Sequence, residues 1–283
     1  MKKITTLLFL IIGSLFFFAA CEIIDPPYKI EKPDHGDTIP DTILVKRVLV
    51  EDYTGHNCPN CPAAAEKAED LKDFYGPQII VMAVHAGYFA KPVPDDPLFS
   101  NDFRTPAGNA WNSFFNITSY PSGMINRIPD DQGNYIISPG NWGLTVDAEL
   151  KKDAEAKITV QNDFSSGTRL LRTTVTTEFL APQDVAFNLV VCITQDSIIG
   201  GQIFTTHVEE NYVFMNVLRG TLNGDWGEDV SGGLDIVADE KYEKTYSIVF
   251  PAEWVAKHCH VVAFIYNTDT YSILQVEEKG VIK

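Results

Sequence analysis

The chain has 283 residues, of which 45% are hydrophobic and 21% charged, so it can bury a core and is not biased enough in charge to be disordered. Against 38 acidic residues there are 22 basic ones, and the formal net charge of −16 argues against a nucleic-acid partner. With 19 glycines and 16 prolines, the composition excludes collagen and a coiled coil. A polytopic membrane protein is excluded because only one apolar run approaches membrane length. We expect an acidic globular protein.

The apolar run at the N-terminus has the features of an export signal. Lys2 and Lys3 precede the apolar stretch 7–18, and small residues follow before Cys21. This arrangement resembles the lipobox of bacterial lipoproteins, in which the cysteine is acylated and the chain is cut in front of it. The resemblance implies a signal peptide over 1–20 and a membrane anchor through lipid on Cys21. An ordinary secretory signal or a single membrane anchor is the alternative.

Residues 21–41 contain four prolines and show no apolar period, so we expect a lipid-anchored tether. Beyond Cys21 the chain has four further cysteines, Cys58, Cys61, Cys192 and Cys259. An even number of cysteines suits an exported protein in an oxidising compartment, where disulfides form and persist.

The first two of these cysteines form a CxxC motif between a predicted strand and a predicted helix. The β-rich segment 43–53 precedes it, helix formers follow it as far as Gly76, and the apolar run 78–85 predicts a second strand parallel to the first. A thiol at a helix N-terminus favours the thiolate form. The pattern therefore predicts Cys58 as a nucleophile and Cys61 as the resolving thiol of a redox site.

Other interpretations of the motif stay open. His56 precedes the first cysteine by two residues and would stabilise a thiolate when protonated, or else point to solvent. The pair could also be a permanently oxidised disulfide that fixes the start of the helix. A zinc site would need a second pair of ligands, which the scattered histidines do not supply. No metal and no cofactor is expected.

In the order of its predicted elements, the segment 42–155 resembles the thioredoxin-like superfamily. A helix is expected over 105–115 and a closing helix over 140–155. Tyr120-Pro121 falls where the superfamily places its cis-proline loop, which implies that this loop pairs with the backbone of a bound substrate; a trans bond in a plain turn is the alternative. The superfamily's usual aromatic residue before the first cysteine is absent, and no buried acidic proton relay can be placed.

The segment 86–106 is longer than a minimal thioredoxin needs, and it would form either a capping insertion or a lip that binds a partner.

From residue 156 onward the pattern changes to short strands separated by turns. Strands are predicted over 157–164, 169–180, 186–195, 241–250, 261–266 and 273–278. This spacing predicts an all-β sandwich of immunoglobulin-like class over 156–283. Cys192 and Cys259 lie on two of the strands, either as buried free thiols or as a disulfide across the sandwich.

The stretch 211–229, together with the lipobox and the CxxC motif, makes the chain similar to the Omp28-related outer-membrane lipoproteins of Bacteroidota. Phe214 and Met215 stand where typical members carry histidines. The resemblance implies a lipoprotein of the cell envelope, held in the outer membrane and facing either the periplasm or the cell surface.

Two functions remain open at this point. The first is an exported thiol-disulfide oxidoreductase or redox-linked chaperone that acts on protein thiols or disulfides through Cys58 and Cys61, with Tyr120-Pro121 presenting the substrate. The second is a non-catalytic surface binding or adhesion lipoprotein that uses the thioredoxin-like fold as a scaffold. Fold analogy alone does not separate them.

Overall fold

The computed structural model describes residues 44–282. The predicted signal peptide, the tether and the lipidation site at Cys21 lie outside the described residues. Within the described part, no helix combines the length and the apolar character that crossing a bilayer requires.

The helices are α2 (Cys61–Tyr75), α3 (Pro106–Phe114) and α4 (Trp142–Leu150). The strands are β1 (Val48–Thr54), β2 (Ile79–His85), β3 (Ser122–Ile125), β4 (Ala156–Ser165), β5 (Leu170–Phe179), β6 (Phe187–Gln195), β7 (Ile198–Ile203), β8 (Val208–Phe214), β9 (Val217–Thr221), β10 (Glu228–Asp229), β11 (Lys241–Val249), β12 (Cys259–Asn267) and β13 (Ile273–Gly280).

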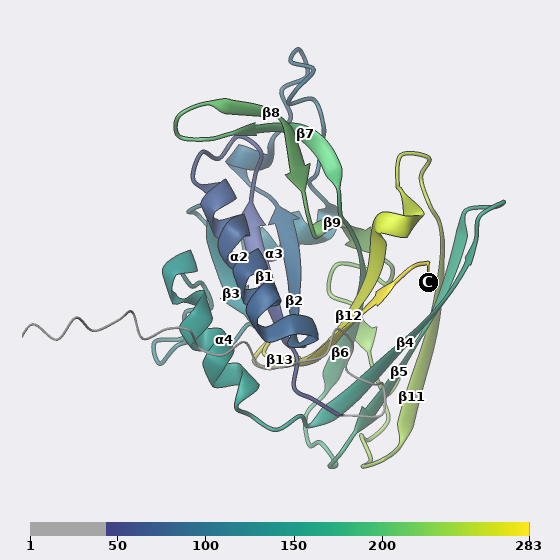
Figure 1. Cartoon of the computed structure of the whole chain (residues 1–283). Helices are drawn as coiled ribbons and strands as arrows, with labels where there is room; N and C mark the ends of the chain where they lie inside the picture. Colours follow the sequence, from purple (N-terminus) through teal and green to yellow (C-terminus); the bar gives the residue numbers. More distant parts are fainter. Residues whose placement is uncertain (1–43, 283) are drawn as a thin grey trace, which may run out of the picture. The chain divides into compact units, whose positions relative to one another are not determined.

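Eight of the strands form one mixed sheet in the order β13-β12-β6-β9-β2-β1-β3, with β10 paired to β6 (Figure 1). β1 and β2 run parallel, as the sequence predicts, and β3 is antiparallel to β1. Strand β9 pairs parallel with β2 at Ala83 and Val217, and antiparallel with β6. β11, β5 and β4 form a second sheet, and β7 and β8 form a separate hairpin.

This sheet shows that the predicted fold class, an α/β thioredoxin-like domain followed by an all-β immunoglobulin-like sandwich, is wrong. No separate thioredoxin-like domain is present in residues 44–282, because β9 continues the β1–β2–β3 sheet into β6, β12 and β13. Local patterns specify strands but not their partners, and this pairing joins segments more than a hundred residues apart. The division at residues 155 and 156 falls between α4 and β4, and as a domain boundary it stays a prediction.

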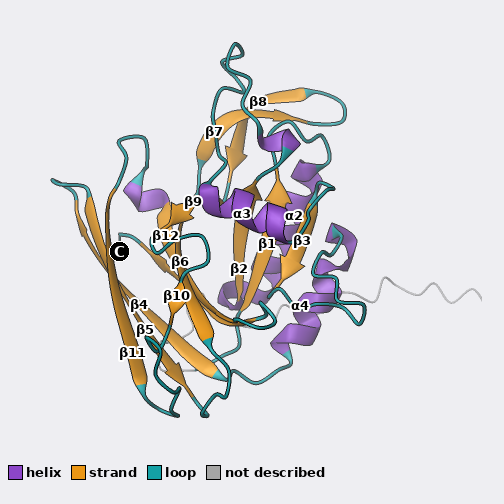
Figure 2. Cartoon of the chain, turned by 180° about the vertical axis from the view of Figure 1, so that it is seen from behind, coloured by secondary structure: helices purple, strands orange, loops and turns teal. Residues whose placement is uncertain are grey.

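Both faces of the long sheet are buried, and different layers cover them. On one face an apolar cluster joins α3 to β1, β2, β6 and β12. On the other face α2 and α4 cover the β1–β2 end, and the three-stranded sheet covers the β6–β12 end (Figure 2). The alternation along β6 follows from this arrangement, since Val190 and Cys192 belong to the first cluster while Val191 and Ile193 face the three-stranded sheet.

A fully buried ion pair lies inside the cluster on the α3 face. Arg127 donates to both carboxylate oxygens of Glu51, from Nε at 2.8 Å and from Nη2 at 2.7 Å, and both side chains have no exposed surface. The guanidinium also lies over the rings of Trp111 and Phe264, at 4.9 and 5.1 Å from their centroids. The charge of Arg127 is therefore compensated by one carboxylate and by the faces of aromatic rings.

Glu51→Gln is expected to lower the free energy of unfolding by about 3 to 5 kcal/mol, because it leaves the guanidinium charge buried without its partner. Urea unfolding at pH 7 measures the change. As a control, Asp147→Asn removes an exposed pair with Lys151 and should cost about 0.5 kcal/mol or less. A loss of similar size in the two variants would contradict the structural role given to the buried pair.

Candidate functional site

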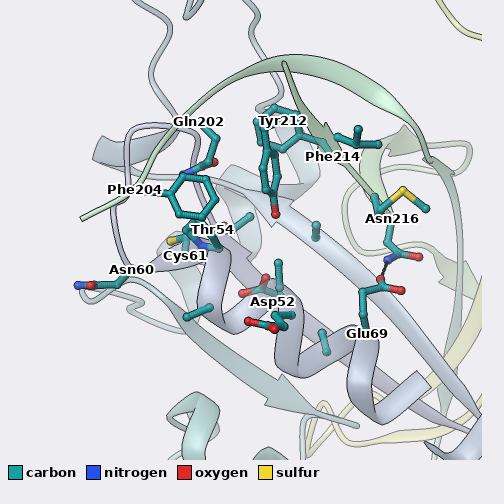
Figure 3. A pocket seen from close by; sticks show the side chains of 18 of the residues that line it. Asp52, Thr54, Asn60, Cys61, Glu69, Gln202, Phe204, Tyr212, Phe214 and Asn216 are labelled. Atoms are coloured by element: carbon teal, nitrogen blue, oxygen red, sulfur yellow. Dashed lines mark hydrogen bonds between the residues drawn. The ribbon is translucent and has the colours of Figure 1, made fainter. Parts of the chain in front are cut away.

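A pocket of about 750 Å³ lies between α2 and the β7–β8 hairpin (Figure 3). The first turns of α2 form one wall, β8 and the end of β7 form the opposite wall, and β1 and β2 form the floor. The polar and aromatic side chains that matter below are Asp52, Cys61, Glu66, Glu69, His85, Phe204, Tyr212 and Phe214. The rest of the lining is mostly small or apolar, so the pocket is an apolar space with a few polar groups.

The CxxC motif lies at one end of this pocket as a disulfide between Cys58 and Cys61. Helix α2 begins at Cys61, so the motif does lie where strand β1 leads into a helix. Each cysteine is only 1% exposed. The carbonyl of Cys58 accepts hydrogen bonds from the backbone N–H of Cys61 at 3.3 Å and from the side-chain amide of Gln202 on β7 at 3.0 Å. The motif is therefore oxidised and bonded to the hairpin above it.

Strand β7 and the segment 86–106 contact the turn that precedes the disulfide. The backbone N–H of Ile203 donates to the carbonyl of His56 at 3.0 Å, and the His56 ring contacts the rings of Phe99 and Phe103. Nε2 of His56 lies 3.1 Å from the carbonyl oxygen of Lys91. Burial lowers the pKa of His56, although the Lys91 carbonyl opposes the shift, so a protonated His56 is disfavoured here. Its predicted role toward a thiolate stays a prediction.

Tyr120 and Pro121 lie just before β3 and are joined by a cis peptide bond. The Tyr120 hydroxyl donates to the side chain of Asn112, and its ring packs against Phe89 at 6.1 Å and on Gly87. A Cβ atom at Gly87 would lie 2.1 Å from the Tyr120 hydroxyl, so this contact requires glycine. Neither Tyr120 nor Pro121 is among the described residues that line the pocket. Contact of this loop with a substrate stays a prediction.

Two buried polar side chains on the pocket floor were not singled out from the sequence. Asp52 is 2% exposed, its Oδ1 has no hydrogen-bond partner among the described residues, and burial raises its pKa to about 7. His85 is 3% exposed, its Nδ1 has no hydrogen-bond partner among the described residues, and burial lowers its pKa to about 3, with smaller contributions from His56 and Arg219. The two adjacent acidic residues that follow the apolar run 48–50 of the predicted strand are the signal that could have indicated Asp52.

Asn216 fixes the hairpin wall of the pocket to the rest of the fold. Its side-chain amide donates to Glu69 of α2 at 2.6 Å, and its side-chain oxygen accepts from Nζ of Lys72 at 3.0 Å. Its backbone carbonyl accepts from the N–H of Ala83 on β2 at 2.9 Å, and its own N–H donates to Asp196 at 2.7 Å. One residue thus joins α2, β2 and the end of β8.

Cys192 and Cys259 do not line the pocket. Cys192 and Cys259 are free and buried, so the predicted alternative of a disulfide between them is wrong. Burial raises the pKa of both thiols, which keeps them protonated and unreactive at neutral pH. Within residues 44–282, no group of three or more histidine, cysteine or acidic side chains is arranged to hold a metal ion.

Asp52→Asn is expected to stabilise the protein relative to the wild type much more at pH 8 than at pH 4. A carboxyl whose pKa rises from 3.8 to about 7 on folding contributes stability that is fully present below pH 3.8 and is lost as the pH rises through 7. For a shift of this size the loss is on the order of 4 kcal/mol, and the uncharged asparagine does not suffer it. Urea unfolding of both proteins from pH 4 to pH 8 measures the difference.

The effect of Asp52 has to be taken from the difference between the variant and the wild type, because titration of His85 changes the free energy of unfolding with pH in the opposite direction. Its pKa is lowered on folding, so it contributes stability that is present above pH 6.5 and lost as the pH falls toward 3. His85→Gln should therefore have a higher free energy of unfolding than the wild type at pH 4 but not at pH 8. If Asp52→Asn had the same effect on stability at both pH values, the carboxyl would not be desolvated as described.

Three comparisons relate the chain to known proteins. The family described as outer membrane protein Omp28 matches residues 108–283. No curated protein sequence matches the chain. Among solved structures, HBP35 of Porphyromonas gingivalis has a TM-score of 0.66 at 16% identity, over 85% of this chain and 77% of its own. Protein AGR_C_4864 from Agrobacterium tumefaciens has a TM-score of 0.50 at 12% identity, and the match covers 85% of this chain and 97% of that protein. A domain of the outer membrane lipoprotein Omp28 from Porphyromonas gingivalis has a TM-score of 0.31 at 23% identity, and the match covers 45% of this chain and 88% of that domain.

The structural similarities to HBP35 and AGR_C_4864, at such low identity, concern the fold alone. The family match covers more than half of the chain, and it includes most of α3, all of α4 and every strand from β3 to β13. It agrees with the resemblance found in the sequence and with the predicted location in the outer membrane. The chain belongs to the Omp28 family of outer-membrane proteins.

Proposed function

We propose that this protein is a non-catalytic binding lipoprotein of the outer membrane, and that the pocket between α2 and the β7–β8 hairpin is its binding site. The observation that carries the proposal is the covered disulfide. Thiol-disulfide exchange needs a thiolate to approach a sulfur atom directly, and Cys58 and Cys61 are each 1% exposed beneath β7. A protein thiol would have to displace the hairpin to reach them.

The pocket has the size and lining expected of a ligand site. Sites for small molecules usually enclose 300 to 1,000 Å³ and combine apolar walls with a few convergent polar groups. Here the walls carry the aromatic side chains of Phe204, Tyr212 and Phe214, and the floor carries Asp52 and His85. Asn216, just after the end of β8, is hydrogen bonded to Glu69 and Lys72 of α2, and these bonds fix the spacing between the hairpin wall and the helix wall.

Membership of the Omp28 family supports a position at the outer membrane. On the proposal, lipid on Cys21 and the proline-containing tether 21–41 attach the folded part to the membrane while leaving it room to meet ligands outside.

A specific observation also favours the second candidate, an exported thiol-disulfide oxidoreductase acting on protein substrates. Asp52, a carboxyl with a pKa of about 7, lines the same pocket as Cys61. A group of this pKa can accept or donate a proton near neutral pH, which thiol chemistry requires. The second candidate would need the β7–β8 hairpin to move away from the disulfide during each reaction.

The reduction potential of the Cys58–Cys61 disulfide separates the two candidates. The described residues 44–282 lie within one compact unit, so the chain from residue 35 onward can be equilibrated in glutathione buffers and trapped with a thiol reagent. We expect a potential below about −300 mV, as for structural disulfides that resist reduction. A potential between roughly −120 and −270 mV, in the range of exchange enzymes, would favour the oxidoreductase instead.

An activity measurement under the same conditions serves as the control. The compact unit should not accelerate reduction of insulin by dithiothreitol above the rate given by the Cys58→Ser/Cys61→Ser double variant. Acceleration that is present in the wild type and lost in the double variant would contradict the non-catalytic proposal even at a low potential.

A further inference from the structure

The charged groups of the pocket are all acidic, and this observation points to the kind of ligand. Asp52 lies on the floor, and Glu66 and Glu69 lie on α2. Among the described lining residues there is no lysine or arginine. Lys72, one turn further along α2, is held by the side-chain oxygen of Asn216. An anionic ligand would thus meet only repulsion, in a protein whose formal net charge is −16.

Asp52 has an unsatisfied hydrogen-bonding need within this space. Its Oδ1 is buried and has no partner among the described residues, although the side chain lines the pocket. A carboxylate without donors in an apolar environment is costly, and a ligand that brings an N–H or a positive charge would remove that cost. His85 does not supply this charge, because burial keeps it neutral at pH 7.

The walls above Asp52 are aromatic. The rings of Tyr212 and Phe214 meet edge to face at 4.8 Å, and Phe204 meets Tyr212 edge to face at 5.9 Å. Figure 3 shows Tyr212 reaching from β8 with its hydroxyl toward the side on which Asp52 lies. Aromatic faces carry partial negative charge and attract cations, most strongly where water is excluded.

We infer that the pocket binds a small organic cation, whose positive nitrogen lies against Asp52 and whose apolar body packs on Phe204, Tyr212 and Phe214 of the β7–β8 hairpin. The inference deepens the proposed function and rests on it. The groups that face the bound nitrogen are Glu66 and Glu69 from α2, His85 from β2 and Tyr212 from β8. Burial, followed by the charges of Asp52, Glu69 and Glu66, raises the pKa of Tyr212, so its hydroxyl stays neutral.

The test uses thioflavin T, an aromatic monocation, and its uncharged benzothiazole counterpart of nearly the same shape. Binding of both to residues 35–283 is measured by equilibrium dialysis at pH 8. We expect the cation to bind more tightly than its counterpart. Asp52→Asn should weaken binding of the cation by about tenfold, as for the loss of one close charge pair, and leave the affinity for the uncharged compound unchanged. At pH 5, where Asp52 is protonated, the wild type should lose the same preference.

Asp163→Asn is the matched control, since Asp163 is an exposed residue of β4 in the three-stranded sheet, and it should leave the affinity for the cation unchanged. Circular dichroism and unchanged binding of the uncharged compound show that Asp52→Asn is folded with its pocket intact. Equal binding of the two compounds to the wild type, no binding of either, or an unaltered affinity of Asp52→Asn for the cation would overturn the inference. Tighter binding of the uncharged compound would overturn it while leaving a binding function in place, and the proposed function fails separately if the disulfide proves catalytic.

Discussion

A short parallel pairing between β2 and β9 is the constraint on which the rest of the structure depends. It consists of the Ala83–Val217 register and one hydrogen bond from Ala83 to the carbonyl of Asn216. Because β9 also pairs with β6, this contact joins the β1–β2–β3 strands to β6, β12 and β13. It also fixes the end of β8, so the hairpin formed by β7 and β8 has to lie over α2. The pocket follows directly from this arrangement.

The two adjacent acidic residues of β1 lie on opposite faces of the sheet and in different surroundings. Successive side chains of a strand point to opposite faces, so Glu51 enters the α3 face and Asp52 the α2 face. Glu51 meets Arg127 and is fully compensated. Asp52 meets a pocket, and its Oδ1 has no partner among the described residues. A paired buried charge fits a core, whereas an unpaired one at a pocket lowers stability, and the proposed ligand would account for its presence there.

The sequence predicts what depends on neighbours along the chain. The strand–helix–strand unit around the CxxC motif, the helix near 105–115 and the six strands after residue 156 all follow from local apolar patterns and appear in the structure. β7, β8 and β9 do not, because Gly200 and Gly201 suggest a turn and the strands after them are short and polar. The pairing of β9 with β2 and β6 depends on contacts distant in sequence. The fold class and the pocket depend on that pairing, so they could not be predicted either. Cys61 could therefore be found in advance, but the wall facing it could not.

If the protein has the proposed binding function, the position of the disulfide explains why a motif so typical of redox enzymes is present. The Cys58–Cys61 bond fixes the turn between β1 and α2, and the carbonyl of Cys58 in that turn accepts the side-chain amide of Gln202. The bond thus holds in place the acceptor to which the hairpin is attached on one side, while Asn216 attaches it on the other. The first attachment joins the hairpin to the turn before α2 and the second joins it to α2 itself. On the proposed function, the oxidised CxxC has a structural role in this arrangement: it preserves the shape of the pocket.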